Sequence, residues 1–165
     1  AEPLPATTGF GALQGNIGSI SNRGVEFTLR SVNFDGGFRW TTDLNLSRND
    51  NKVESLATDQ PLYRGFSAAG VGATNVIRVG EPLGTFWGLK FLGVDAATGD
   101  ALYDDFNGDG RISTDDAQVI GNAQPKLIGG LTNNFSWKGF DLSVFFQFSY
   151  GNKVMNYINS AILNP

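Results

Sequence analysis

The chain contains no cysteine and no histidine among its 165 residues, and it has only one methionine. Without cysteine there are no disulfides and no catalytic thiolates, and without histidine there is no imidazole for a triad or a general base. The common kinds of zinc site also need one of these two residues. Their absence therefore excludes most hydrolase mechanisms.

Charge is also scarce. Charged residues make up 17% of the chain, and 16 Asp and Glu against 12 Lys and Arg give a net charge of −4. Because no run of Lys or Arg is present, the sequence offers no basic surface for a phosphate backbone, and nucleic acid is not an expected partner. No stretch approaches the ~20 apolar residues of a transmembrane helix, and the first residues lack the pattern of a signal peptide.

Glycine and phenylalanine are abundant, with 22 and 13 copies, which favours turns and aromatic strands over helices or disorder. Residues 1–24 are rich in small and polar residues and are predicted to be a loop that leads into the domain. From residue 25 onward, apolar and polar residues alternate with a period of two, as in half-buried strands. Residues 25–165 are therefore predicted to form one antiparallel all-β domain.

The first predicted hairpin spans residues 25–46. Its apolar positions are odd in the first strand and even in the second, so a three-residue loop between the strands is excluded by parity. The smallest solution is a type I′ turn of two residues at Asp35 and Gly36. This turn pairs Phe27 with Leu44.

The second predicted hairpin spans residues 127–150, and the same parity argument selects a two-residue turn at Lys138 and Gly139. The turn pairs Phe135 with Leu142. Between the hairpins, residues 50–126 are predicted to form a long loop region with one strand around residues 86–94.

The length of these strands suits a membrane. About ten residues at a rise of ~3.3 Å, tilted by ~40°, give a height of ~25 Å, which matches the apolar band of an outer-membrane barrel. The Phe-rich faces would meet lipid, the aromatic side chains near the short turns would lie at the interface, and the polar faces would look inward. The charged and amide side chains on those polar faces are Glu26, Arg30, Arg39, Asp43, Asp141 and Gln147.

The predicted fold is therefore an antiparallel up-and-down transmembrane β-barrel segment. Only five or six such strands fit in the chain, whereas a complete single-chain barrel needs at least ~8, so the chain is expected to be a fragment. The alternative that the pattern leaves open is a soluble, calcium-stabilised β-sandwich that binds surface glycans.

An acidic loop at residues 105–116 follows the template of a calcium-binding loop. Oxygen ligands fall at loop positions 1, 3, 5, 9 and 12, position 7 would supply a backbone carbonyl, and Gly110 permits the sharp turn. The predicted calcium ligands are Asp105, Asn107, Asp109, Arg111, Ser113 and Asp116. Ser113 is expected to cap one short helix after the loop, with Gly121 and Pro125 ending it. A single helix cannot act as a sensor pair, so calcium here would be structural.

Two weaker signals of function are explained more simply by structural roles. The adjacent carboxylates Asp104/Asp105 and Asp115/Asp116 could act as catalytic pairs, but a cation loop explains them better. The aromatic side chains that could stack on sugars are more simply core or interface residues; they are Tyr63, Phe66, Phe86 and Trp87. No catalytic residue and no enzyme activity are expected.

Six segments, in this order along the chain, closely resemble the C-terminal part of SusC/RagA-type TonB-dependent outer-membrane transporters. They are residues 16–26, 49–53, 79–84, 105–112, 120–126 and 140–147. The resemblance implies a bacterial outer-membrane barrel of about 22 strands, closed by an internal plug, that takes up oligosaccharides or peptides. It also implies a SusD-like surface lipoprotein as a lid and energy delivered through TonB. The signal sequence, plug, TonB-contact segment and barrel-closing strand of such transporters are not among these residues, and no substrate-contact residue can be assigned.

Overall fold

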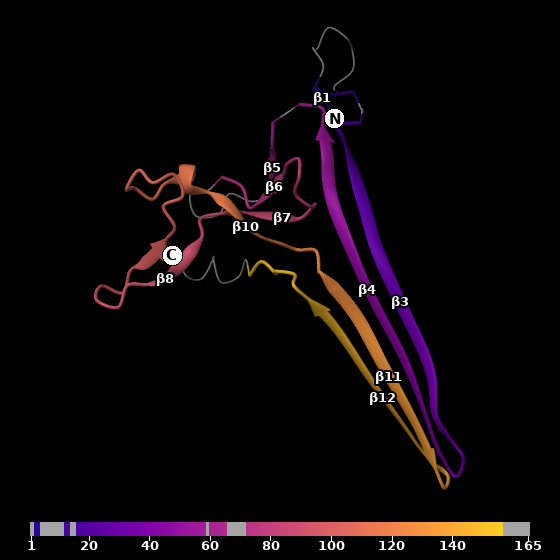
Figure 1. Ribbon diagram of the computed structural model, residues 1–165. Helices are drawn as coiled ribbons and strands as arrows, with labels where there is room; N and C mark the ends of the chain where they lie inside the picture. Colours follow the sequence, from indigo (N-terminus) through magenta and orange to yellow (C-terminus); the bar gives the residue numbers. More distant parts are fainter. Residues whose placement is uncertain (1, 4–11, 14–15, 59, 66–71, 157–165) are drawn as a thin grey trace.

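The computed structural model describes residues 2–3, 12–13, 16–58, 60–65 and 72–156, and the description below refers to them. Its main element is a four-stranded antiparallel sheet in the order β12-β11-β4-β3. The sheet forms a long ribbon, and both of its hairpin turns lie at one end (Figure 1). The bounds of its strands are β3 Gly18–Asp35, β4 Phe38–Leu56, β11 Leu127–Trp137 and β12 Phe140–Tyr150.

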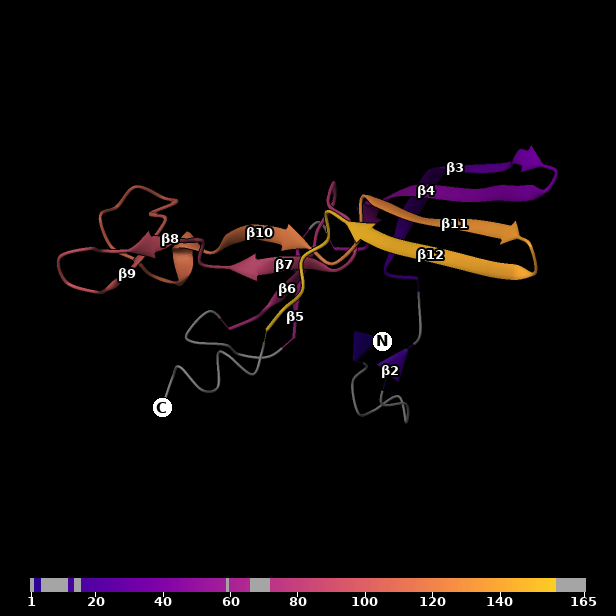
Figure 2. The same ribbon diagram turned by 90° about the horizontal axis from the view of Figure 1, so that it is seen from below.

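Short strands gather at the other end of the ribbon (Figures 1 and 2). They form a four-stranded sheet in the order β10-β7-β6-β5 and two pairs, β8-β9 and β1-β2. Their bounds are β1 Glu2–Pro3, β2 Ala12–Leu13, β5 Leu62–Arg64, β6 Asn75–Ile77, β7 Thr85–Gly88, β8 Phe91–Val94, β9 Ala101–Tyr103 and β10 Gln118–Asn122. The prediction of a long loop over residues 50–126 is therefore wrong in detail. The single strand expected at residues 86–94 is two strands, β7 and β8, in different sheets.

All the pairings between strands are antiparallel, which confirms the predicted all-β antiparallel class for the described residues. The only described helical element is a single 3-10 turn at Thr114–Asp116, which we call η2. No helix in the described part of the chain has the length and apolar character needed to cross a membrane.

The turn between β3 and β4 differs from the predicted one. Asp35 pairs with Arg39, so three residues lie between the paired positions, in place of the predicted two-residue turn at Asp35 and Gly36. Such a turn alone would bring apolar residues opposite polar ones. A β-bulge at Asn33 resolves the conflict, because one extra residue in β3 exchanges its two faces beyond that point.

The register of this hairpin is consequently displaced by two residues. Phe27 pairs with Leu46 and not, as predicted, with Leu44. A displacement by two residues keeps every side chain on its own face, so the predicted faces remain valid although the predicted pairs are wrong. The strand β3 also begins at Gly18, earlier than the predicted residue 25; residues 1, 4–11 and 14–15 of the predicted leading loop lie outside the described residues.

The second hairpin has the predicted register. Phe135 pairs with Leu142 and the turn lies at Lys138 and Gly139, whose φ values are 48° and 85°. Positive φ at both central positions is what a type I′ turn requires, and its twist matches that of the flanking strands. The prediction for this turn and these pairs is confirmed.

One face of the long sheet is mainly polar on all four strands, with Val32, Ile128 and Phe145 as its exposed apolar exceptions. Arg30 lies opposite Asp43, with Nε 2.6 Å from the carboxylate, and Arg39 lies 3.7 Å from Asp35. On the same face, Ser143 on β12 donates to Asn134 on β11 over 2.8 Å. The predicted set Glu26, Arg30, Arg39, Asp43, Asp141 and Gln147 shares this face in the observed register.

The opposite face is apolar, and no other described element covers it (Figures 1 and 2). Its large side chains are exposed in the chain as it stands, with 77% of Phe140 and 60% of Phe146 accessible. Other exposed members of this face are Val25, Phe27, Leu29, Phe34, Phe38, Trp137, Leu142 and Phe148. A soluble protein seldom leaves so continuous an apolar surface open unless another molecule or a membrane covers it.

A polar row interrupts the apolar face three rows from the turns. Asn133 Oδ1 accepts hydrogen bonds from Thr42 Oγ1 over 2.7 Å and from Trp40 Nε1 over 2.9 Å. Asn33, the bulged residue, donates to Thr42 over 2.7 Å and accepts from Ser31. Each of these side chains has at least one hydrogen-bond partner in the row, which lowers the cost of placing the row in an apolar environment.

The buried core lies at the far end of the ribbon from the turns. Among the described residues, the buried hydrophobic side chains are Val53, Ala73, Val76 and Ala117, and the buried polar ones are Thr74, Thr85 and Asp116. Val53 belongs to the end of β4, and its backbone N–H and C=O bond to Glu81 and Gly80 over 3.0 and 2.9 Å. The short sheets are thereby anchored to the long one.

Candidate functional site

The acidic loop leads from β9 to η2 and is organised by its own side chains. The Asp105 carboxylate accepts hydrogen bonds from the backbone N–H groups of Gly108, Asp109 and Gly110 over 2.8, 3.2 and 2.8 Å. Gly108 and Gly110 adopt φ values of 75° and 80°, which side chains rarely permit. One carboxylate therefore folds the loop around its two glycines.

The other predicted ligands are occupied in the same way. Asn107 Oδ1 accepts from the Asp109 N–H over 2.9 Å, and Asp109 Oδ1 accepts from the Arg111 N–H over 2.8 Å. Ser113 Oγ accepts from the Asp115 N–H over 3.1 Å. Each of these oxygens keeps a second lone pair, the kind of donor that a hard cation binds.

Asp116 is the buried end of the loop. Its carboxylate is fully inaccessible and accepts from the N–H of Ser113 over 2.8 Å and of Asn107 over 3.3 Å. The pKa of Asp116 is lowered, mainly because the Ser113 N–H donates a hydrogen bond to the carboxylate. Burial acts in the opposite direction but is the smaller effect. A carboxyl group with a lowered pKa stabilises the fold above its ordinary pKa, and that contribution is lost as the pH falls through the lowered value.

Asp116 and Ser113 form the predicted capping box at the start of η2. The helix ends earlier than predicted, because Ala117 already has extended backbone angles and β10 follows at once. Gly121 lies within β10 and Pro125 beyond it, so neither residue ends the helix.

The loop does not gather its carboxylates around one point. Among the described residues, no group of three or more His, Cys, Asp or Glu side chains is arranged to hold a metal ion. The donor set is made only of oxygens, which suits calcium, but calcium binding stays a prediction.

Three of the four adjacent carboxylates, Asp104, Asp105 and Asp116, have structural partners. Asp104 accepts from Lys90 and from Gln118, each over 3.1 Å, and the Lys90 hydrogen bond is the main cause that lowers the pKa of Asp104. Asp105 is engaged with the backbone as described above. The lowered pKa of Asp104 is the opposite of what a general acid near neutral pH needs.

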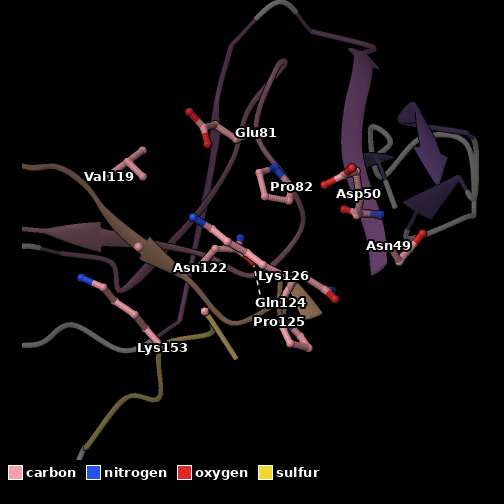
Figure 3. A pocket seen from close by; sticks show the side chains of 13 residues that line it. Asn49, Asp50, Glu81, Pro82, Val119, Asn122, Gln124, Pro125, Lys126 and Lys153 are labelled. Atoms are coloured by element: carbon pink, nitrogen blue, oxygen red, sulfur yellow. Dashed lines mark hydrogen bonds between the residues drawn. The ribbon is translucent and has the colours of Figure 1, made fainter. Parts of the chain in front are cut away.

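A cavity of about 370 Å³ lies where the long sheet meets the short ones (Figure 3). Its walls come from β4, from the segment after Gly80, from β10 and from the segments that follow β10 and β12. Asn51 accepts from the Leu83 N–H over 2.7 Å, and Lys153 donates its backbone N–H to Asn122 over 2.8 Å. These bonds hold the wall segments together, so the cavity lies where the long sheet is connected to the short sheets.

The charged residues of this cavity are partly neutralised. Asp50 pairs with Arg48 over 3.1 Å, and Glu81 pairs with Arg78 over 3.2 Å. Sequence reasoning identified no site here because the walls come from segments far apart in the chain. A signal was present, since three of the segments that carry the resemblance, residues 49–53, 79–84 and 120–126, line this one cavity.

A second cavity, of about 460 Å³, is lined by two of the aromatic residues considered in the sequence, Tyr63 and Trp87. Their rings meet at a centroid distance of 5.5 Å and an interplanar angle of 62°. Phe86 lines a different cavity, and Phe66 lies outside the described residues.

Comparison with known proteins places these features in a family context. No family model matches the chain. TonB-dependent receptor P26 of Formosa agariphila is 40% identical to it over 93% of the chain, and TonB-dependent receptor SusC of Bacteroides thetaiotaomicron is 26% identical over 92%. The chain spans 17% and 16% of the length of these two relatives.

A solved structure of the RagAB peptide importer in its open-open state has the same fold over 92% of the chain, with a TM-score of 0.73 and 22% identity. The chain covers 17% of that structure's chain. The curated relatives are named as receptors, which is consistent with the expected lack of enzyme activity.

Proposed function

This chain is homologous to a segment of the TonB-dependent receptors of the SusC type, and on that premise we propose that it forms part of the wall of an outer-membrane barrel that imports nutrients. The chain spans about a sixth of such receptors, so the activity belongs to the longer protein. Energy would come through TonB, and a SusD-like surface lipoprotein would be the partner that closes the passage.

The observation that carries this proposal is the contrast between the two faces of the long sheet. Its apolar face leaves Phe140, Phe146 and their neighbours exposed, while its polar face carries the Arg30–Asp43 pair and a ladder of hydrogen bonds. Lipid would cover the first face and water the second, as in a transmembrane barrel. At the interruption by Thr42 and Asn133, the hydrogen bonds to Asn133 Oδ1 lower the cost of contact with lipid.

The soluble β-sandwich is less well supported. A sandwich buries the apolar face of one sheet against that of a second sheet. In the described part of the chain, the short sheets lie beyond the end of the long sheet and leave its apolar face open. The chain would then have to expose its phenylalanines to water.

The proposal is tested in the full-length protein expressed in its own host. We expect it in the outer-membrane fraction, folded after detergent extraction and with heat-modifiable mobility on gels. We also expect the deletion of TonB to abolish growth on its cargo. A full-length protein that is recovered folded from the aqueous fraction would refute the proposal.

Two classes of cargo are open at this level. The RagAB relative is a peptide importer, which makes peptides one candidate. Oligosaccharides are the other, and the sequence resemblance favours neither class over the other.

We also propose that the acidic loop binds calcium as a structural ion, through Asp105, Asn107, Asp109, Arg111, Ser113 and Asp116. The order of the oxygens along the loop and the sharp turn at Gly110 support this proposal. Loops of this kind that face an extracellular medium can bind as weakly as ~10⁻⁴–10⁻³ M and still be filled. Calcium would add rigidity to the loop without performing chemistry.

Calcium at ten times its Kd is expected to stabilise the full-length protein by about 1.4 kcal/mol, measured as the shift in thermal unfolding between calcium and a chelator. The Asp105→Asn variant should lose this calcium-dependent shift, whatever its own stability. Asp100→Asn, in the exposed turn before β9, is the matched control and should retain it. An Asp105→Asn protein with the full shift would contradict the assignment.

A further inference from the structure

We propose that the cavity beside Tyr63 and Trp87 is a binding subsite for a neutral oligosaccharide, with Thr114 and Asp115 as its polar contacts. The inference rests on the proposed function, because it names the class of cargo that the transporter would take. The residues that line the cavity are Tyr63, Gly72, Ala73, Trp87, Thr114, Asp115 and Ala117.

The two aromatic rings form a corner. At a centroid distance of 5.5 Å and an angle of 62°, they present two walls that are steeply inclined to each other. Tyr63 is 47% exposed and Trp87 is half-buried, so both retain accessible surface. A sugar ring has apolar C–H faces and a polar rim, and it can place one face on an aromatic ring while its hydroxyls point away.

Four polar groups of the cavity form no hydrogen bond with any other described residue. They are the Tyr63 hydroxyl, the Trp87 indole N–H, the Thr114 hydroxyl and the Asp115 carboxylate. The indole donates, the carboxylate accepts, and the two hydroxyls do both. A sugar hydroxyl needs this mixture, since each is both a donor and an acceptor.

The charge of the lining favours some ligands over others. It contains the Asp115 carboxylate and no basic residue. A free peptide carboxylate or a uronic acid would meet repulsion here without a cation to pair with. The subsite is therefore expected to favour neutral sugars over peptides and over acidic sugars.

The walls are held by backbone structure, which keeps the corner in place before a ligand binds. Trp87 donates its backbone N–H to Thr74 over 2.9 Å and pairs with Val119 of β10. Thr114 and Asp115 lie on η2, which is fixed by the capping box and by the buried Asp116. The acidic loop would thus serve the subsite by presenting these two residues.

The test is binding of the full-length receptor, in detergent, to an array of neutral and uronate-containing oligosaccharides, followed by calorimetry with the neutral sugar that binds best. We expect Trp87→Ala and Tyr63→Ala each to raise its Kd by about tenfold or more, as is common for buried aromatic anchors. Phe106→Ala is the control, because Phe106 is 64% exposed on the neighbouring loop and does not line the cavity; its Kd should be unchanged. Asp115→Asn should improve binding of uronate-containing sugars relative to neutral ones.

Folding of each variant is checked by its heat-modifiable mobility. If no neutral oligosaccharide on the array binds, or if binding is unchanged in folded Trp87→Ala and Tyr63→Ala proteins, the inference is wrong. The same conclusion follows if peptides bind and lose affinity in these variants. In each of these cases a receptor that still assembles in the outer membrane and depends on TonB leaves the proposed function intact.

Discussion

The Phe146→Arg variant is expected to fail in outer-membrane assembly. Phe146 lies on β12 in the middle of a fully apolar row, opposite Leu131, and 60% of it is exposed on the face that we assign to lipid. An arginine on the lipid face of a barrel costs about 2–4 kcal/mol near the bilayer midplane and less toward the interface. The measurement is the free energy of unfolding in detergent or lipid, together with the amount of folded protein in the outer-membrane fraction.

The control is Gln147→Arg, at the next residue of the same strand. Gln147 lies on the polar face, opposite Gly130, so its replacement puts an arginine of equal size and charge on the side assigned to water. We expect close to wild-type assembly, with a change in stability within about 0.5 kcal/mol. Equal losses in the two variants, or a larger loss in Gln147→Arg, would reverse the assignment of the faces.

The strands were predictable from the sequence where the pattern is long and the turn is local. In the second hairpin, eleven-residue strands supply enough alternating positions to define a face. The pair Lys138 and Gly139 accommodates the positive φ values that a two-residue turn requires. Both signals lie within one short segment, so no knowledge of the rest of the chain was needed.

The first hairpin shows why parity alone is insufficient. The bulge at Asn33 adds a residue that the alternation does not reveal, because a three-residue turn with a bulge leaves the same faces as a two-residue turn without one. What stabilises the bulge is the polar row, where Asn33 bonds to Thr42. That contact joins two strands, and Thr42 in turn bonds to Asn133 of a third strand. Sequence periodicity within one strand does not contain this information.

The region between the hairpins escaped prediction for a different reason. Its strands have three to five residues, which is too short for a period to be recognised. They are stabilised by pairing between distant segments, as when Asn122 of β10 pairs with Thr85 of β7.

The candidate sites divide in the same way. The acidic loop was recognisable because its twelve residues bond mainly to one another, and the capping box of Ser113 and Asp116 was predicted from spacing alone. The cavity beside Tyr63 and Trp87 was not predicted, since four separate segments of the chain assemble it. In the sequence, those aromatic residues looked like ordinary core residues.

A second large effect is expected from Gly24→Ala, in the part of β3 next to Asn49 of β4. A Cβ atom at position 24 would lie 2.5 Å from the backbone oxygen of Arg48, well inside van der Waals contact. The obstacle is backbone and not the end of a flexible side chain, and β4 is held on its other side by pairing with β11 as far as Ser47, next to Arg48. The two strands would have to separate locally, so we expect a loss of about 1–3 kcal/mol in the free energy of unfolding.

The control is Gly36→Ala, in the turn of the same hairpin, where an added Cβ meets no atom within 4 Å and the backbone needs no positive φ. Both variants make the same chemical change and reduce the freedom of the unfolded chain equally, so any difference between them reports the close approach at Gly24. We expect Gly36→Ala to be neutral or slightly stabilising by denaturant unfolding of the full-length protein. Equal stability of the two variants would mean that β3 and β4 are not this close at Gly24. The observed pairing of Gly24 with Asn49 would then have to be revised.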